Sequence, residues 1–383
     1  MLSSSVPIVI LTLIVAVILL ASRHPRLVSL FKWLPVPLWC YALPMAAATM
    51  GWLPHEHEAW RLLIATCLPF ALALLLLGVD LGRVARMGGP LLAAAAAGAA
   101  GVMAGAPLGT WLLHGALPAE AWKGAGALAA TWTGGTMNML AARALLDVPD
   151  AVFAPLVVVD AVTAYGWMAL LVLLSGFQAP LNRWLCAEDG PALSPAASPT
   201  PDHPVRGSLA AGIALAAGLT VAGFWVAGRL PTSRWISSAS GWAVLLVTTA
   251  TLVLSAFAGV RRAGSAVSDL GYTCLYLVLA ATGVQARPEA LWETPAWLAV
   301  GLITVLVHGG LLLAVGRMVR IPAGALATAS QANIGGVVSA PLVGAVYDRS
   351  LAPAGLLLAL AGNALGTYFG WAAAIIGRWF LSG

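Results

Sequence analysis

Long runs of apolar residues recur along this chain, and short polar or basic stretches separate them. Runs of about 17–25 apolar residues are long enough to cross the hydrocarbon core of a bilayer. Inside lipid every backbone amide needs a partner within the protein, so such runs are expected to be helices. They lack the apolar–polar alternation of barrel strands. We therefore predict an all-α polytopic membrane protein with twelve segments, at residues 6–21, 35–53, 60–78, 90–113, 121–146, 151–176, 207–228, 236–258, 269–286, 294–316, 322–347 and 351–381.

The composition points to the same class. Hydrophobic residues make up 61% of the 383 residues and charged residues only 9%, whereas soluble domains carry roughly 25% charged residues. The net charge of +5 comes from basic residues scattered between the runs, as the positive-inside rule expects. We therefore expect membrane lipid and no nucleic acid as a partner. We interpret residues 6–21 as a retained helix, with a signal peptide as the alternative.

Signatures of catalysis and metal binding are absent from the sequence. It contains no H-E-x-x-H, G-x-S-x-G or P-loop motif, and its four cysteines lie far apart without C-x-x-C spacing. His55-Glu56-His57-Glu58 lacks the spacing of a known metal site. We expect no enzyme activity, no metal site and no cofactor, apart from Na⁺ or H⁺ as a coupling ion.

Residues 178–206 differ from the rest because prolines, serines and acidic residues replace the apolar run. We predict a solvated linker there. It separates an N-terminal repeat, 1–177, from a C-terminal repeat, 207–383, with six segments each. Short matches recur between the halves at the same offset, namely Ala127-Leu128-Ala129 with Ala325-Leu326-Ala327 and Ala154-Pro155 with Ala352-Pro353. Weak internal repeats of this kind are typical of secondary transporters.

The segments at 121–146 and 322–347 occupy equivalent places in the two halves, and both are interrupted. Each carries a double glycine and an asparagine among hydroxyl or amide side chains. Glycine weakens a helix by about 1 kcal/mol, and amides in lipid need partners. We predict a broken or re-entrant helix in each half. If both are re-entrant, most of the 19 Lys and Arg residues fall on one side, the cytoplasmic one, and the repeats are inverted. Broken helices that cross the bilayer remain the alternative.

The polar residues at these two breaks are the candidate binding site. Unwound backbone exposes carbonyls, which suit Na⁺, and helix N-terminal amides, which suit an anion. Hydrogen bonding that only holds helices together is the alternative interpretation. The candidates for substrate or ion binding are Thr133, Gly134, Gly135, Thr136, Asn138, Ser330, Gln331, Asn333, Gly335, Gly336 and Asn363.

Asp160 is the candidate for ion coupling. It lies about ten residues into an apolar segment, and an acid at bilayer depth costs at least about 2.5–3.5 kcal/mol on insertion scales. Intramembrane acids usually mark ion or proton pathways, although a protonated core carboxyl would also fit. His308, within the tenth segment, fits either a proton relay or a packing role. Two glycine ladders predict close helix packing, at Gly101, Gly105 and Gly109 and at Gly362, Gly366 and Gly370.

These motifs resemble a known family. Thr133-Gly134-Gly135-Thr136-Met137-Asn138, Asp160 before Trp167-Met168, and Ser330-Gln331-Ala332-Asn333-Ile334-Gly335-Gly336 are similar to the YjcL-like membrane proteins, which contain the domain of unknown function 819. That family is similar in plan to cation/proton antiporters and anion symporters. The resemblance implies an ion-coupled carrier in which a core, bearing paired broken segments, moves against a panel.

The sequence therefore predicts a sodium- or proton-coupled transporter of a small organic solute, which we expect to be anionic. Segments four to six and ten to twelve would form the core, and segments one to three and seven to nine the panel, with a homodimer through the panel left open. We place it in a bacterial inner membrane, with a plastid membrane as the alternative. A cation/proton antiporter without organic substrate and a non-transporting membrane protein are the other hypotheses.

Overall fold

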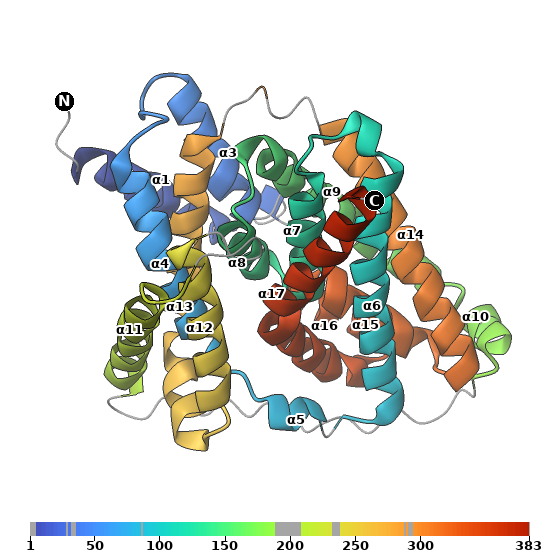
Figure 1. Ribbon diagram of the computed structural model, residues 1–383. Helices are drawn as coiled ribbons and strands as arrows, with labels where there is room; N and C mark the ends of the chain where they lie inside the picture. Colours follow the sequence, from blue (N-terminus) through green and yellow to red (C-terminus); the bar gives the residue numbers. More distant parts are fainter. Residues whose placement is uncertain are drawn as a thin grey trace. The chain divides into compact units, whose positions relative to one another are not determined.

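The computed structural model describes residues 5–27, 30–31, 36–85, 87–187, 208–231, 238–286, 289 and 294–382. Within them every regular element is a helix, so the all-α prediction is confirmed. The first half contains α1 (Ser5–Ser22), α3 (Val36–Thr49), α4 (Glu58–Leu76), α5 (Leu81–Ala85), α6 (Gly89–Leu112), η1 (His114–Ala116), α7 (Ala121–Gly134), α8 (Thr136–Leu146), α9 (Asp150–Ser175) and α10 (Gln178–Leu185). The second half contains α11 (Ser208–Ala227), α12 (Ala239–Leu254), α13 (Ala258–Gln285), α14 (Thr294–Val319), α15 (Ala323–Ile334), α16 (Gly336–Tyr347), η3 (Arg349–Leu351) and α17 (Ala352–Ser382) (Figure 1).

Among the described residues, seven helices are long and apolar enough to cross a membrane: α4, α6, α9, α11, α13, α14 and α17. Four shorter apolar helices, α1, α3, α12 and α16, accompany them. Large apolar side chains stand exposed along α14, including Leu302, Leu306 and Leu313. Such a face suits lipid rather than water. The prediction of a multi-pass membrane protein is therefore confirmed at this level.

Local chemistry explains where several helices begin and where the predicted bounds miss. His57 Nδ1 accepts the amide of Ala59 at 3.1 Å at the start of α4, and Ser238 Oγ accepts the amide of Gly241 at 3.1 Å at the start of α12. Both are N-caps. The predicted segment 269–286 began too late, because α13 starts at Ala258. Its first turns carry Arg261 and Arg262, which lower the hydropathy without interrupting the helix.

The start of the predicted linker also needs correction. Residues Gln178–Leu185 form the helix α10, and residues 188–207 lie outside the described part of the chain. Pro180 sits in the first turn of α10, where its missing N–H is not needed. Asn182 Oδ1 accepts the amide of Ala323 at 2.8 Å. The proline density suggested a linker, but this long-range contact holds the segment as a helix.

The chain forms two compact units. Unit 1 comprises Met1–Gly78, Arg143–Ala161 and Pro204–Pro295, and unit 2 comprises Val79–Ala142, Val162–His203 and Ala296–Gly383. Unit 1 holds segments one to three and seven to nine, and unit 2 holds four, five and ten to twelve. This grouping follows the predicted division of the segments, except that α8 and α9 contribute to both units; the roles of panel and core stay predictions. The repeats 1–177 and 207–383 are therefore not separate compact bodies, and their inverted relation stays a prediction.

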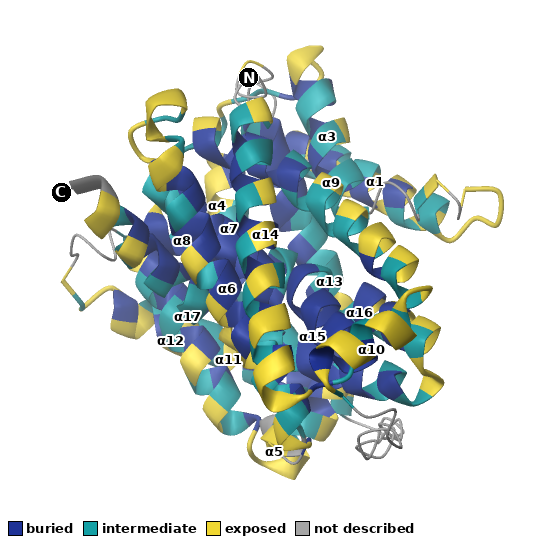
Figure 2. Ribbon diagram, turned by 90° about the vertical axis from the view of Figure 1, so that its right-hand side faces the viewer, coloured by how far each residue is buried: buried dark blue, intermediate teal, exposed yellow. Residues whose placement is uncertain are grey.

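Each unit has an apolar interior of its own. In unit 1, Leu74 of α4 and Leu77 directly after its end pack with Val247 of α12 and Val267 of α13. In unit 2 the cores of α6, α14, α15 and α17 share one cluster. All of α15 and nearly all of α7 are buried, whereas α14 carries many exposed residues (Figure 2). The first helices of the two predicted broken segments, α7 and α15, thus lie in the interior of unit 2.

Candidate functional site

The first helix break lies at the double glycine Gly134–Gly135. Helix α7 ends at Gly134, and Gly135 has a φ of +77°. A residue with a Cβ rarely adopts this backbone conformation, which glycine adopts without steric cost. The amide of Gly135 still donates to the carbonyl of Thr131 at 2.6 Å, and α8 begins at Thr136. The prediction of a break here is confirmed.

Asn138 ties this break to α17. Its Nδ2 donates to the carbonyl of Gly134 at 2.5 Å and to the carbonyl of Asn363 at 3.1 Å. Its Oδ1 accepts the hydroxyl of Thr367 at 2.5 Å. Asn138 is only 1% exposed, so these bonds occupy an amide that lies out of reach of water. The side chain of Asn138 therefore acts as a clamp, which means that it bonds the helix break and α17, a helix from the other half of the chain, at the same time.

The glycine ladder of α17 lets this clamp form. A Cβ at Gly362 would lie 2.3 Å from the carbonyl oxygen of Thr133, and a Cβ at Gly366 would lie 2.7 Å from the Cα of Gly134. Helix α17 therefore touches the backbone of α7 directly, and the two run side by side in Figure 1. The prediction of close helix packing at this ladder is confirmed, and the helix it packs against ends at the first break. The ladder of α6 instead packs against α14, where a Cβ at Gly101 would lie 2.6 Å from the Cα of His308.

The second break lies at Gly335–Gly336. Helix α15 ends at Ile334, and Gly336 at the start of α16 has a φ of +72°. In both breaks the second glycine of the pair is thus the left-handed one. This predicted break is also confirmed, and α15 contacts α7 within unit 2, so the two broken segments are neighbours.

Gln331 leaves one end of a buried amide without a partner at this break. Its Nε2 donates to the hydroxyl of Ser339 at 2.9 Å, whereas Oε1 has no hydrogen-bond partner among the described residues. Exchanging the two ends of the amide would leave the nitrogen unpaired instead. Gln331 is 1% exposed, and an unpaired buried polar atom typically costs about 1–3 kcal/mol. The site therefore offers an unused polar atom beside a helix break.

Ser330 joins three helices through an ordered chain of hydrogen bonds. The indole Nε1 of Trp167 donates to Ser330 Oγ at 2.8 Å, and Ser330 Oγ lies 2.8 Å from His308 Nε2. His308 Nδ1 lies 2.8 Å from the carbonyl oxygen of Gly98, which can only accept. Nδ1 therefore carries the proton, and in the neutral ring Nε2 accepts the Ser330 hydroxyl. Asn333 adds a bond from Nδ2 to the carbonyl of Ala95 at 3.1 Å.

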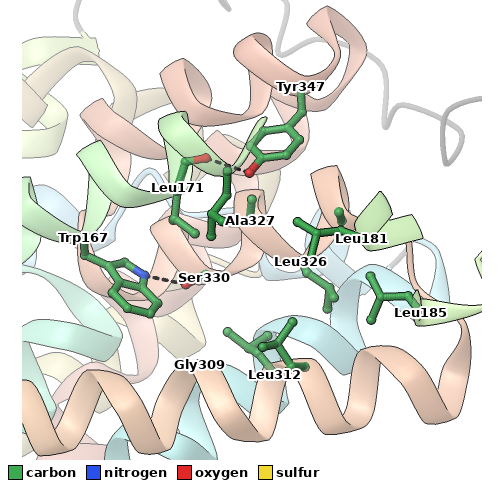
Figure 3. Close-up of a pocket in the computed structure, with 13 residues that line it drawn as sticks. Trp167, Leu171, Leu181, Leu185, Gly309, Leu312, Leu326, Ala327, Ser330 and Tyr347 are labelled. Atoms are coloured by element: carbon green, nitrogen blue, oxygen red, sulfur yellow. Dashed lines mark hydrogen bonds between the residues drawn. The ribbon is translucent and has the colours of Figure 1, made fainter. Parts of the chain in front are cut away.

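A small cavity of about 90 Å³ ends at this chain of bonds. Leucines of α9, α10, α14 and α15 form most of its wall, together with Trp167, Ser330 and Tyr347 (Figure 3). The Tyr347 hydroxyl already donates to the carbonyl of Leu171 at 2.6 Å. The polar side chains on the cavity wall are thus few, and Ser330 and Trp167 are bonded to each other (Figure 3).

Unit 2 gathers all the candidates except Asp160. The hydroxyl of Thr133 donates to the carbonyl of Ala129 at 2.7 Å, and Thr136 is half-buried in the first turn of α8. The side chain of Asn363 lies beside the first break, because its Oδ1 would be 3.4 Å from a Cβ at Gly135. Asp160 is half-buried in α9 and belongs to unit 1, so its coupling role stays a prediction.

Sequence reasoning weighed His308 only as an isolated residue and gave no site role to Trp167 or Gly98. The sequence signals for this network are a histidine in an apolar segment and Ser330 beside the second helix break. Its partners come from helices far apart in the sequence, and no local pattern marks them.

Comparison with known proteins identifies the family. The model of the family described as "Protein of unknown function (DUF819)" matches residues 9–381. The match spans nearly the whole chain, so the chain belongs to this family, and the resemblance to it is confirmed. No curated protein matches the chain. The wider likeness to antiporters and symporters stays a prediction.

Proposed function

We propose, from the premise that this chain is a multi-pass helical membrane protein of the DUF819 family, that it is an ion-coupled secondary transporter of a small anionic organic solute. The observation that carries the proposal is the pair of helix breaks at Gly135 and Gly336. There is one in each half of the chain, and both lie inside unit 2. Matched discontinuous helices of this kind are how transporters build a binding site near the bilayer midplane.

The physical argument is the cost of breaking a helix in lipid. Each break frees backbone N–H and C=O groups, which are tolerated at membrane depth only where protein buries them or a cavity solvates them. The C-terminal ends of α7 and α15 present carbonyls that favour a cation, and the N-terminal ends of α8 and α16 present amides that favour an anion. The unpaired amide atom of Gln331 adds a polar group that a bound ion or solute would satisfy.

We assign unit 2 to the mobile core and unit 1 to the panel, which would also supply the surface of a homodimer. Asp160 would carry Na⁺ or H⁺. Asp160 directly precedes Ala161, the last residue of α9 that belongs to unit 1. A change in the charge of Asp160 therefore acts on a helix that both units share. The polar residues of the two breaks would bind solute and ion. This role involves no catalysis and no cofactor, and we place it in a bacterial inner membrane.

Ligand-dependent stability tests this function. Purified protein in detergent would be heated in the presence of Na⁺, at several pH values, and with a set of small carboxylates and amino acids. A ligand at one hundred times its dissociation constant should stabilise the fold by about 2.7 kcal/mol. We expect a carboxylate to stabilise the wild type only with Na⁺ or at low pH, and Asp160→Asn to lose that dependence. A response to cations alone would favour the cation/proton antiporter.

Cysteine accessibility tests alternating access separately. Positions 134 and 335 are unsuitable, because a Cβ would lie 2.3 Å from Asn138 Nδ2 and 1.9 Å from Gln331 Nε2, respectively. Thr136 and Val337 follow the breaks and are partly buried, so Thr136→Cys and Val337→Cys in a cysteine-free background are the better probes. We expect their labelling from the two sides of a proteoliposome to shift in opposite directions when ligand is added. Labelling that never depends on ligand, ion or pH would refute the transporter proposal.

A further inference from the structure

We propose that His308 and Ser330 form a site that binds one proton together with one small monocarboxylate, the carboxylate occupying the cavity beside Ser330. The inference rests on the proposed function and deepens it by naming a solute class and a proton site in unit 2, in addition to the ion-coupling role proposed for Asp160. It arises from the direction of the hydrogen bonds in unit 2, which leaves the network one way to accept a proton.

The network as it stands is saturated. Gly98 holds the proton on Nδ1 of His308, so the hydroxyl of Ser330 must donate to Nε2. Trp167 is a donor only and occupies a lone pair of the same oxygen. The hydroxyl therefore has no proton to offer toward the cavity that Ser330 lines.

Adding a proton to Nε2 reverses one bond. The imidazolium then donates to Ser330 Oγ, and Trp167 continues to donate to the same oxygen. The hydroxyl proton of Ser330 is released from the ring and can turn into the cavity. One N–H bond forms, at Nε2, with a proton taken up from solvent, and the O–H bond of Ser330 stays intact; the other changes are to hydrogen bonds. Protonation of His308 thus makes the Ser330 hydroxyl available as a hydrogen-bond donor to a ligand in the cavity.

The charge on the ring then requires an anion. His308 is 0% exposed, and the groups that face it are the Gly98 carbonyl of α6, the Trp167 indole of α9 and the Ser330 hydroxyl of α15, with the Asn333 amide beside Gly98. All are uncharged. A buried cation without a counter-charge is strongly disfavoured. A carboxylate accepting from Ser330 supplies that counter-charge, so proton and anion are bound as a neutral pair.

The cavity selects the rest of the solute. Leu171, Leu312 and Leu326 are among the apolar side chains that line it, and its volume is about 90 Å³. Sites for drug-sized ligands are several times larger, at about 300–1,000 Å³. The ligand that fits is therefore a short aliphatic chain with a single carboxylate, and butyrate and valerate are suitable probes.

Equilibrium binding in detergent tests this site without depending on transport. Radiolabelled valerate would be titrated into the purified full chain from pH 5 to pH 8, with a pH-indicator dye recording proton uptake. We expect one proton taken up per valerate bound, and an affinity that falls by about tenfold per pH unit where His308 is neutral in the free protein. Valerate binding without proton uptake, or no valerate binding at any pH, would overturn the proposal.

Two variants and a control locate the effect. His308→Gln keeps a polar group near Nε2 but cannot be protonated, so proton uptake should vanish. Ser330→Ala removes the donor, so valerate affinity should fall by at least tenfold. Thr328→Val removes a buried hydroxyl of the same helix, which among the described residues bonds only the carbonyl of Gly324, at 2.7 Å, and should keep both binding and proton uptake. Thermal unfolding of each variant shows that it is folded.

The outcomes separate this inference from the proposed function. Coupled proton uptake that persists in His308→Gln would refute the site but leave the transporter proposal intact. Conversely, coupled binding that depends on His308, in a protein whose labelled cysteines never change accessibility, would support the site and refute transport.

Discussion

Removing the side chain of Asn138 should destabilise unit 2 more than removing an ordinary buried hydrogen bond. Asn138→Ala deletes the bonds to the carbonyls of Gly134 and Asn363 and the bond from Thr367. At about 0.6 kcal/mol for each hydrogen bond in a membrane protein, these bonds sum to about 2 kcal/mol. The Thr367 hydroxyl also loses its acceptor, which adds about 1–3 kcal/mol. We expect a loss of about 3–5 kcal/mol in the free energy of unfolding.

The assay is reversible unfolding in mixed detergent micelles, followed by tryptophan fluorescence. Thr110→Val is the matched control, because Thr110 is fully buried and, within the described part of the chain, its hydroxyl bonds only to the carbonyls of Ala106 and Pro107 in its own helix. It should cost about 1 kcal/mol or less. In the double variant Asn138→Ala/Thr367→Val the orphaned hydroxyl is gone, so the combined loss should be smaller than the sum of the two single losses. If Asn138→Ala costs no more than Thr110→Val, Asn138 does not clamp the break.

Three further predictions follow from the same contacts. Gly336→Ala meets no atom within 4 Å, so it isolates the cost of the left-handed backbone and should lower the unfolding free energy by about 1–2 kcal/mol. Gly362→Ala would place a Cβ 2.3 Å from the Thr133 carbonyl oxygen and should be clearly more damaging in the same assay; equal losses would refute the close packing of α17 on α7. Trp167→Phe removes the indole donor while the Ser330–His308 bond remains, so it should lower the unfolding free energy by about 1 kcal/mol and leave one proton taken up per valerate bound. Loss of proton uptake in that variant would show that the indole is needed to orient Ser330.

The breaks could be predicted from the sequence because their cause is local. A double glycine in an apolar segment weakens the helix wherever the chain goes next, and only glycine adopts the left-handed conformation found at Gly135 and Gly336 without strain. The residues that hydrogen-bond at the breaks could not be predicted in this way. Nothing near Asn138 in the sequence indicates that Asn363 and Thr367 will meet its amide, because the contact depends on how α17 packs against α7.

The same division holds for the rest of the molecule. Hydrophobic runs determined the helical membrane class, since backbone amides in lipid have no other solution. Only tertiary structure decided that α10 is a helix held by the Asn182–Ala323 contact, and that α8 and α9 contribute to both units. It also decided that His308 is one member of an ordered chain of bonds through Ser330 rather than an isolated packing residue. Hydrophobic periodicity and glycine content act over a few residues, whereas hydrogen-bond partners and compact units come from helices far apart in the chain.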